Sequence, residues 1–420
     1  MSIFIREAKV LDPQSSHHNK VVNILIKEGK IISIDQKEHR ADTVIDANGQ
    51  YVMPGLFDMK ANFCDPGFEH KEDIHSGCQL AAASGFTGVA LIPNTDPVVQ
   101  TKSHIEYTKS KSRDYLTDVY PIAAVTLDAK GEDLTEMIDL HEAGAIAFSD
   151  GEQPMWHTDI MLKSLIYLQK FDGLLINQPE DKLLTRFGSM NEGIVSTGLG
   201  LKGMPALAEH LMIKRDLDIL AYSGGRLHFS NISSKESVKL IKQAKKKGLN
   251  VTCDVSIHHL IHTDADLEDY DSNYKINPPL REEKDRKALI KGLKEGIIDV
   301  IVSAHSPQDE ESKKLEYDLA ENGILGLQTM IPALLSLSEE LEPAEWVSKL
   351  TSAPREILKL PKVILEENST TNLTLMNPQT SWVYDKDSNL SQSVNSPWFG
   401  QELTGKITAT INGTKEHLSE

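Results

Sequence analysis

The stretch Val52-Met-Pro-Gly-Leu-Phe-Asp58, followed closely by Asp65-Pro-Gly67, divides the chain into two kinds of sequence. Before it, β-rich runs alternate with polar or glycine-containing turns, which predicts short strands. After it, apolar runs of four to six residues alternate with stretches of helical periodicity. Continuous apolar runs are typical of buried parallel strands, so the repeated strand–helix units predict a parallel α/β barrel that begins with this stretch.

Further apolar runs can supply the remaining barrel strands, because their spacing leaves room for a helix between neighbours. Helical periodicity fills several of these intervals, for example Lys235–Lys247 and Glu282–Glu295. The candidate strands are Gly88–Ile92, Asp118–Ala124, Ala145–Phe148, Leu174–Asn177, Leu227–Ser230, Asn250–Asp254 and Asp299–Ser303.

Strand-like sequence returns near the carboxyl end of the chain. The runs concerned are Asn372–Met376, Ser381–Tyr384 and Gly405–Ile411. Strands at both chain ends can pair with each other beside the barrel. We therefore predict a TIM-like (β/α)₈ barrel over residues 53–361 and a small β domain composed of residues 1–52 and 362–420.

The composition is that of an ordinary globular protein, with 40% hydrophobic and 25% charged residues among 420. A formal net charge of -18 repels phosphate backbones, so no nucleic-acid partner is expected. No run approaches the roughly 18 apolar residues of a membrane span, and no signal peptide is expected. Cys64, Cys78 and Cys253 are too few for a disulfide framework, which favours a reducing cytoplasm.

Several motifs in combination resemble the dihydroorotases of the amidohydrolase superfamily. The resemblance runs from about residue 2 to about residue 413 and is strongest to the bacterial type that works alongside aspartate transcarbamoylase. It rests on Val52–Asp58 and Asp65–Gly67, and on Pro93-Asn-Thr-Asp-Pro97, Glu192-Gly193, Leu199-Gly-Leu-Lys-Gly-Met-Pro205, Arg215-Asp216, Asn277-Pro-Pro-Leu280 and Asn395-Ser-Pro-Trp-Phe-Gly400.

The resemblance implies a cyclic amidohydrolase that uses one or two zinc ions at the carboxyl-terminal mouth of the barrel. In such enzymes the metal polarises the amide carbonyl and lowers the pKa of a bound water. Imidazoles and carboxylates are the ligands that suit this metal.

The metal-ligand places of the family carry other residues in this sequence. Lys60-Ala61-Asn62 stands where the family has His-x-His, and Gln178 and Asn231 stand at two further histidine places. Ala304 takes the place of the aspartate that also acts as general base. Asp150 remains, although the family has two aspartates there and this chain has Gly151 next. We therefore predict no metal cage and no cofactor.

The substrate contacts that the resemblance implies are altered as well. Cys64 stands at the place of the arginine that binds the substrate carboxylate, whereas Asn94 and Asn277 are kept. Both asparagines belong to strong turn-forming motifs, so they indicate the fold and do not by themselves indicate binding. Asn191 and Gln308 occupy two further histidine places of the family.

Lys60 introduces a cation where the family binds one. We hypothesise that it forms a buried ion pair with Asp150 and supplies the missing positive charge. The alternative is that Lys60 extends to solvent at the barrel mouth.

The remaining histidines and thiols give weaker signals. His258 and His262 could form a metal pair at helical spacing, but a structural role is expected for them and for His259. His305, beside Ala304, could act as a general base, although a hydrogen-bonded structural residue is more typical at a strand end. Cys64 could act as a nucleophile with His70 or His75, but an idle thiol is the preferred interpretation.

Three functions follow as hypotheses. The first is a catalytically inactive dihydroorotase-like protein that acts as a structural partner of aspartate transcarbamoylase in a mixed or homo-oligomeric assembly. The second is an active dihydroorotase or related amidohydrolase with an unusual site, converting carbamoyl aspartate to dihydroorotate. The third is a protein that binds a pyrimidine precursor without turning it over.

Overall fold

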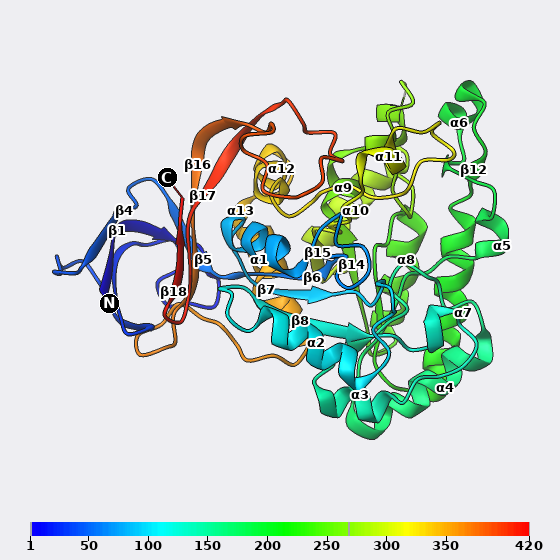
Figure 1. The fold of residues 1–420 in the computed structure, drawn as a ribbon, viewed down its shortest axis with the longest axis horizontal. Helices are drawn as coiled ribbons and strands as arrows, with labels where there is room; N and C mark the ends of the chain where they lie inside the picture. The colour runs from blue at the N-terminus through cyan, green and yellow to red at the C-terminus, as the bar shows by residue number, and fades with distance from the viewer. Residues whose placement is uncertain (1, 268, 420) are drawn as a thin grey trace.

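The computed structural model describes residues 2–267 and 269–419. Its ribbon separates into a β domain, which holds both ends of the chain, and a larger barrel surrounded by helices (Figure 1). The predicted fold class, a (β/α)₈ barrel beside a small β domain built from both chain ends, is confirmed.

The β domain contains one mixed sheet with the strand order β18-β17-β16-β5-β1-β2-β3, and β4 pairs with β1. Strands from the two chain ends meet where β16 runs antiparallel to β5, with Leu375 opposite Val52. Both residues belong to a separate apolar core under this sheet. The strands are β1 (Ser2–Val10), β2 (Val21–Lys27), β3 (Lys30–Asp35), β4 (Thr43–Asp46), β5 (Tyr51–Pro54), β16 (Asn372–Val383), β17 (Glu402–Asn412) and β18 (Lys415–Leu418).

The barrel contains eight strands in the order β15-β14-β13-β10-β9-β8-β7-β6, all of them parallel. A bridge between Ala61 and His305 brings the first and last strands together. The strands are β6 (Leu56–Ala61), β7 (Phe86–Leu91), β8 (Asp118–Ala123), β9 (Ala147–Phe148), β10 (Leu175–Asn177), β13 (Leu227–Phe229), β14 (Val251–Ser256) and β15 (Val300–Val302).

Helices cover the outside of the barrel and extend its loops (Figure 1). The helices are α1 (Ile74–Ala83), α2 (Lys102–Ser112), α3 (Met137–Ala143), α4 (Thr158–Leu168), α5 (Lys182–Thr185), α6 (Ile194–Leu199), α7 (Leu207–Ser223), α8 (Lys235–Lys246), α9 (Ile257–Ile261), α10 (Glu283–Lys294), α11 (Glu310–Lys313), α12 (Met330–Ser336), α13 (Pro343–Leu350) and α14 (Ser352–Ile357). A short pair of strands, β11 (Met190–Asn191) and β12 (Gly203–Met204), lies in the excursion that carries α5 and α6.

Both faces of the barrel strands are buried, which explains their continuous apolar sequence. Along β15, Val300 and Val302 belong to one apolar cluster with Phe57, whereas Ile301 between them joins the larger cluster that includes helix residues. This alternation follows from the period of two in a strand. No helix among the described residues is long and apolar enough to cross a lipid bilayer.

The stretch Val52–Asp58 is divided between two sheets. The expectation that all of it belongs to the first barrel strand is therefore wrong. Its first half is β5 of the β domain, and its second half begins β6 of the barrel. Gly55 makes the change of sheet possible, because a β-carbon there would collide with the side chains of Asn372 and Thr87.

Candidate ligand-binding site at the barrel mouth

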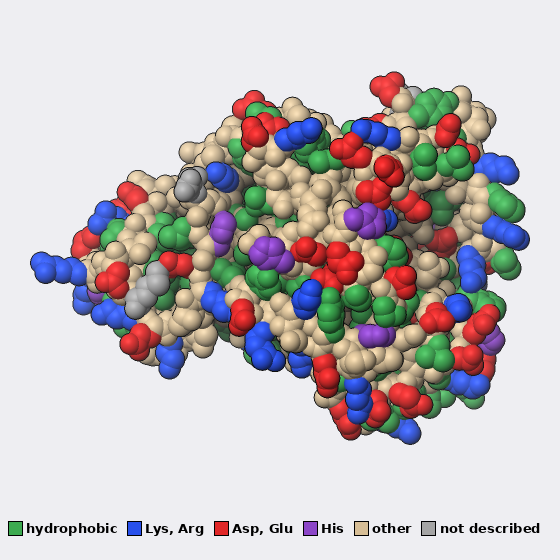
Figure 2. Space-filling view, viewed as in Figure 1, with side chains coloured by type: hydrophobic (Ala, Val, Ile, Leu, Met, Phe, Trp, Pro, Cys, Tyr) green, Lys and Arg blue, Asp and Glu red, His purple; other side chains and the backbone are tan. Residues whose placement is uncertain are grey.

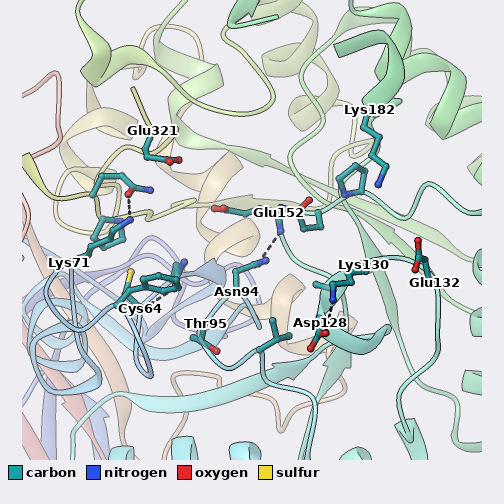
Figure 3. A pocket seen from close by; sticks show the side chains of 18 residues that line it. Cys64, Lys71, Asn94, Thr95, Asp128, Lys130, Glu132, Glu152, Lys182 and Glu321 are labelled. Carbon is teal, nitrogen blue, oxygen red and sulfur yellow. Dashed lines mark hydrogen bonds and ion pairs between the residues drawn. The ribbon is translucent and has the colours of Figure 1, made fainter. Parts of the chain in front are cut away.

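Two connected cavities open at the carboxyl ends of the barrel strands. The outer one has a volume of about 720 Å³ and the inner one about 290 Å³. Figure 3 shows the outer cavity, with Lys71 and Glu321 on one side, Lys182 on the other and Glu152 between them. The two cavities share Glu152, Gln153, Pro154, Lys182, Gln308 and Glu321.

Lys60, at the end of β6, is buried in the wall of the inner cavity with 6% of its surface exposed. Its ammonium group donates a hydrogen bond of 2.7 Å to Oε1 of Gln178, which follows β10. Gln178 in turn donates from Nε2 to the carbonyl of Asn277 at 3.2 Å. Two residues that the resemblance places at ligand positions are therefore hydrogen-bonded directly to each other.

Both expectations for Lys60 are wrong. Its ammonium is not paired with Asp150, and it does not extend to solvent, because the adjacent side-chain amide of Gln178 lies inside the barrel and accepts its hydrogen bond. Burial lowers the pKa of Lys60, while the carboxylates of Asp254, Glu152 and Asp58 oppose that shift. The inner cavity thus contains one buried cation surrounded by acidic groups.

Asp150 lines neither of the two cavities, and its carboxylate holds the neighbouring loop. Its carboxylate accepts hydrogen bonds of 2.9 Å from the backbone of Val125 and Thr126, and one of 2.6 Å from the Thr126 hydroxyl. Burial raises its pKa, and these donors counteract that effect. Since the donors at the end of β8 satisfy it, Asp150 is not available to Lys60.

Glu152 is the acidic residue that faces the cavities, and the sequence alone did not identify it. Figure 3 shows its side chain directed into the outer cavity. Its backbone donates to Oδ1 of Asn94 at 3.0 Å, and Asn94 donates to the carbonyl of Asp150 at 3.2 Å. Desolvation raises the pKa of Glu152, and Lys60 opposes the rise. The sequence does contain a signal for Glu152. Gly151 follows Asp150 where the resemblance implies a second aspartate, so the next carboxylate of this chain comes one position later, at residue 152.

Three residues at the strand ends have left-handed backbones: Cys64 at φ 59°, Asn231 at φ 54° and Ala304 at φ 47°. Such conformations are strained for residues with a β-carbon and are concentrated at functional sites. The backbone of Asn231 donates to Asp254 at 2.6 Å, and that of Ser303 donates to Asp58 at 3.0 Å. Buried carboxylates therefore support the strand ends, and burial raises the pKa of Asp58 to about 7.

The amides at the other ligand places have different surroundings. Oδ1 of Asn62 accepts from the backbone of Cys64 at 2.8 Å, so it closes a local turn. Oδ1 of Asn231 is buried and has no hydrogen-bond partner among the described residues. The methyl group of Ala304 borders the inner cavity and supplies no base.

Most residues that the resemblance implies as substrate contacts line one of the two cavities. Cys64 and Asn94 line the outer cavity, and Asn277 lines the inner one. Asn277 donates to Glu180 at 2.7 Å, and its Oδ1 lacks a partner among the described residues. Gln308 accepts from Lys71 at 2.7 Å.

Asn191 lies outside these two cavities, in a buried network with Asp264 and Arg281.

Cys64 is unsuited to nucleophilic chemistry. Its side chain is buried, and burial raises the pKa of the thiol to about 12, so the thiolate is scarce at neutral pH. His70 is placed 3.8 Å from Asp309, and His75 is bonded to Tyr115 at 2.7 Å. Both histidines therefore have other partners.

The central histidines are buried and uncharged. Burial lowers the pKa of His259 and of His262 to about 4, and it also lowers the pKa of His258 well below its ordinary value. His258 and His259 border the inner cavity, whereas His262 packs its ring against Tyr274 and Trp398.

His305 does not line either cavity within the described chain. Its Nδ1 accepts from the backbone of Gly326 at 3.3 Å, and its Nε2 lies 3.8 Å from Glu72. These contacts fit the structural role that its position at a strand end favours.

The donor chemistry does not fit the zinc that the resemblance implies. The ligand places offer an ammonium, amides, a methyl group and a carboxylate that is directed elsewhere. Zinc requires three or four thiolate, imidazole or carboxylate donors around one point. No group of three or more such side chains is arranged to hold a metal in residues 2–267 and 269–419.

Comparison with known proteins decides the family. The model of the "Dihydro-orotase-like" family matches residues 49–237. The dihydroorotase of Syntrophus aciditrophicus is 38% identical over 417 residues, 98% of each chain. That of Pelotomaculum thermopropionicum is 40% identical over 98% of this chain and 97% of its own.

The chain belongs to the dihydroorotase family. Its fold also resembles that of the L-hydantoinase from Arthrobacter aurescens, with a TM-score of 0.87, 22% identity, and coverage of 100% of this chain and 97% of that one. At this identity, the likeness shows the fold alone.

The Lys60–Gln178 contact predicts how a single and a double variant should differ in stability. Gln178→Met removes the acceptor and leaves a buried ammonium without it, so the free energy of unfolding should fall by about 2 kcal/mol. Lys60→Met/Gln178→Met replaces both partners with apolar groups of similar shape and should recover the part of the loss that comes from the unpaired ammonium, while the bond to the Asn277 carbonyl stays lost. Urea unfolding of both variants and the wild type measures this. A double variant less stable than Gln178→Met would contradict the pairing.

The buried His259 predicts acid sensitivity. Its pKa is about 4 in the folded protein and about 6.5 unfolded, so the unfolded chain binds the proton first on acidification. Its stabilising contribution is complete above pH ~6.5 and is lost as the pH falls towards 4. Between pH 6.5 and 4.5, the wild type should lose about 2 kcal/mol more than His259→Gln, which can keep the donor to the Pro278 carbonyl. Equal losses in urea unfolding would contradict this state of His259.

Proposed function

We propose that this dihydroorotase-family protein serves pyrimidine biosynthesis in the cytoplasm without catalysis, as a structural partner of aspartate transcarbamoylase. The observation that carries the proposal is the 2.7 Å hydrogen bond between Lys60 and Gln178. It joins two family ligand places to each other, and it puts an ammonium where a metal would need an imidazole.

The remaining groups at the mouth support the loss of catalysis. Ring closure or opening of a cyclic amide needs a group that polarises the carbonyl and a base that moves a proton. Ala304 replaces the family's base, and His305 interacts with Gly326 and Glu72. Glu152 has a carboxyl group, but its charge interacts with the buried ammonium of Lys60. This interaction favours a role in neutralising Lys60 over a role in moving protons.

The partner and compartment follow from family likeness and from the state of the cysteines. The sequence resembles the bacterial dihydroorotases that work alongside aspartate transcarbamoylase, and relatives named dihydroorotase match over 98% of the chain. A fold kept over its full length without its chemistry suits a role in assembly. Cys64, Cys78 and Cys253 are free thiols, in keeping with a reducing cytoplasm.

The proposal predicts no turnover together with complex formation. The purified protein should cyclise carbamoyl aspartate no faster than buffer, with or without added zinc or chelator, while the dihydroorotase of Syntrophus aciditrophicus assayed in parallel is active. Mixed with aspartate transcarbamoylase from its own organism, it should co-elute in size-exclusion chromatography. Chelator-sensitive turnover would instead support an active enzyme with an unusual site, and separate elution would remove the partner.

A second candidate function, the binding of a pyrimidine precursor without turnover, has one specific observation in its favour. Asn231 and Asn277 line the inner cavity, and the Oδ1 atom of each is buried without a hydrogen-bond partner among the described residues. Buried acceptors of this kind are costly unless a donor reaches them, and an amide N–H of a ligand is such a donor.

Ligand binding would raise the unfolding temperature. If this candidate holds, excess dihydroorotate or carbamoyl aspartate should shift the midpoint upward by a few degrees, since a ligand at about 100 times its Kd adds about 2.7 kcal/mol. Asn231→Ala should abolish the shift because it removes one free acceptor, whereas Asn48→Ala on the β domain should keep it. No shift in the wild type at millimolar ligand would remove this function.

A further inference from the structure

Among the described residues, Lys60 is the only lysine that is both buried and in the wall of the inner cavity. Two further lysines, Lys275 and Lys313, are buried, and the ammonium of each donates to two backbone carbonyls within residues 318–323. Within the described chain, the ammonium of Lys60 donates to Gln178 alone. Two of its three N–H groups are therefore uncommitted beside a cavity.

The inner cavity has the features of a site for an amine nucleophile. Apolar side chains contribute to its wall, among them Ile276, Ala304 and Ile324. Burial lowers the pKa of Lys60, so the neutral amine forms more readily than in water. The cavity lies at the carboxyl ends of the barrel strands, where barrel proteins place their reacting groups. The strained backbones of Asn231 and Ala304 border the same space.

An amine at this place can form an imine with an aldehyde or a ketone, and the product keeps the local charge. A bond forms between Nζ and the carbonyl carbon, and the carbon–oxygen bond breaks. Two of the three ammonium protons leave with that oxygen as water, so the protonated imine keeps one N–H and one positive charge. The carboxylates of Asp58, Glu152 and Asp254, which favour the charged form of Lys60, favour this cation too.

Three buried acceptors belong to residues that line the same cavity. The Oδ1 atoms of Asn231 and Asn277 have no hydrogen-bond partner among the described residues, and neither has Nδ1 of His259. Nε2 of His259 lies 3.1 Å from the Pro278 carbonyl, which can only accept, so in the neutral ring Nδ1 is an acceptor. Buried acceptors favour a ligand that brings donors, and hydroxyl groups are such donors.

The charge around the inner cavity disfavours an anionic ligand. Acidic side chains also gather over α11, whose first turn is acidic and whose following loop brings Glu321 to the mouth (Figure 2). Like charges repel across such a poorly solvated space, so a carboxylate or phosphate on the ligand is unfavourable. The charged residues that line the inner cavity are three acids, Glu152, Glu180 and Glu321, and two lysines, Lys60 and Lys182.

We propose that Lys60 captures a small, uncharged, hydroxylated aldehyde or ketone as an imine in the inner cavity. The carbonyl carbon of the ligand binds Nζ, and its hydroxyl groups donate to the free oxygens of Asn231 and Asn277. Hydrolysis, the same step in reverse, releases the ligand. The carbonyl groups of amides and ureas do not form imines, so this capture is separate from the binding of a pyrimidine precursor and from the transcarbamoylase partner.

Reductive trapping of the full-length protein tests the capture. Glyceraldehyde is added at neutral pH with sodium cyanoborohydride, which reduces an imine to a stable secondary amine, and peptide mass spectrometry then locates the adduct. The adduct should form at Lys60 about tenfold faster than at an exposed lysine such as Lys27, because each unit by which a pKa falls gives about tenfold more neutral amine. Pyruvate, which carries a carboxylate, should react more slowly at Lys60 than glyceraldehyde.

Variants separate the nucleophile from the hydroxyl recognition. Lys60→Arg keeps a cation without a reactive amine and should abolish the adduct at residue 60, whereas Lys27→Arg on the β domain is the matched control and should keep it. Asn231→Gly removes one acceptor and tolerates the left-handed backbone. It should slow the trapping of glyceraldehyde about tenfold and leave that of propanal, which has no hydroxyl group, unchanged. Unfolding temperatures show whether each variant folds, and the wild-type peptide map needs no variant.

Three outcomes would overturn the inference. The first is an unmodified Lys60 in wild-type protein whose exposed lysines react. The second is an adduct at Lys313, whose pKa burial lowers to about 7, in place of Lys60. The third is equal trapping of glyceraldehyde and propanal at Lys60, which would remove the hydroxylated ligand. None of these results depends on binding to transcarbamoylase, so the proposed function can fail or hold independently.

Discussion

The hydrogen bond from Lys60 to Gln178 is the interaction on which the mouth of this barrel depends. A buried cation needs an acceptor and nearby negative charge, because water cannot reach it to compensate. Gln178 supplies the acceptor, and Glu152, Asp58 and Asp254 supply the negative field. Together they form a charge balance in which the protein's own ammonium provides the positive member, and the family's metal is not needed for that purpose.

Around this charge balance, the ends of the barrel strands carry left-handed backbones next to buried carboxylates. Ala304 and Asn231 have left-handed backbones at the strand ends, which are strained for residues with a β-carbon. The carboxylates of Asp58 and Asp254 accept hydrogen bonds from the backbone at these strand ends.

Much of the fold could be predicted from the sequence, because it is written in local patterns. Continuous apolar runs marked the barrel strands, and the predicted helix Lys235–Lys247 differs from the observed α8 by one residue. The division of Val52–Asp58 between two sheets could not be predicted, since it depends on what surrounds Gly55 in three dimensions. At the site, the residue types could be read from the sequence, but their hydrogen-bond partners could not be predicted from it. Whether Lys60 meets Asp150 or Gln178 is decided by loops distant in sequence, which also direct Glu152 into the cavity.

The central claim is that this mouth is balanced by Lys60 and holds no catalytic metal. Elemental analysis of the purified protein, after expression in zinc-supplemented medium and gel filtration without chelator, tests it most directly. The account predicts zinc at background level in protein whose unfolding temperature does not change with added zinc. About one or two zinc ions per chain, the complement of a working amidohydrolase site, would contradict it.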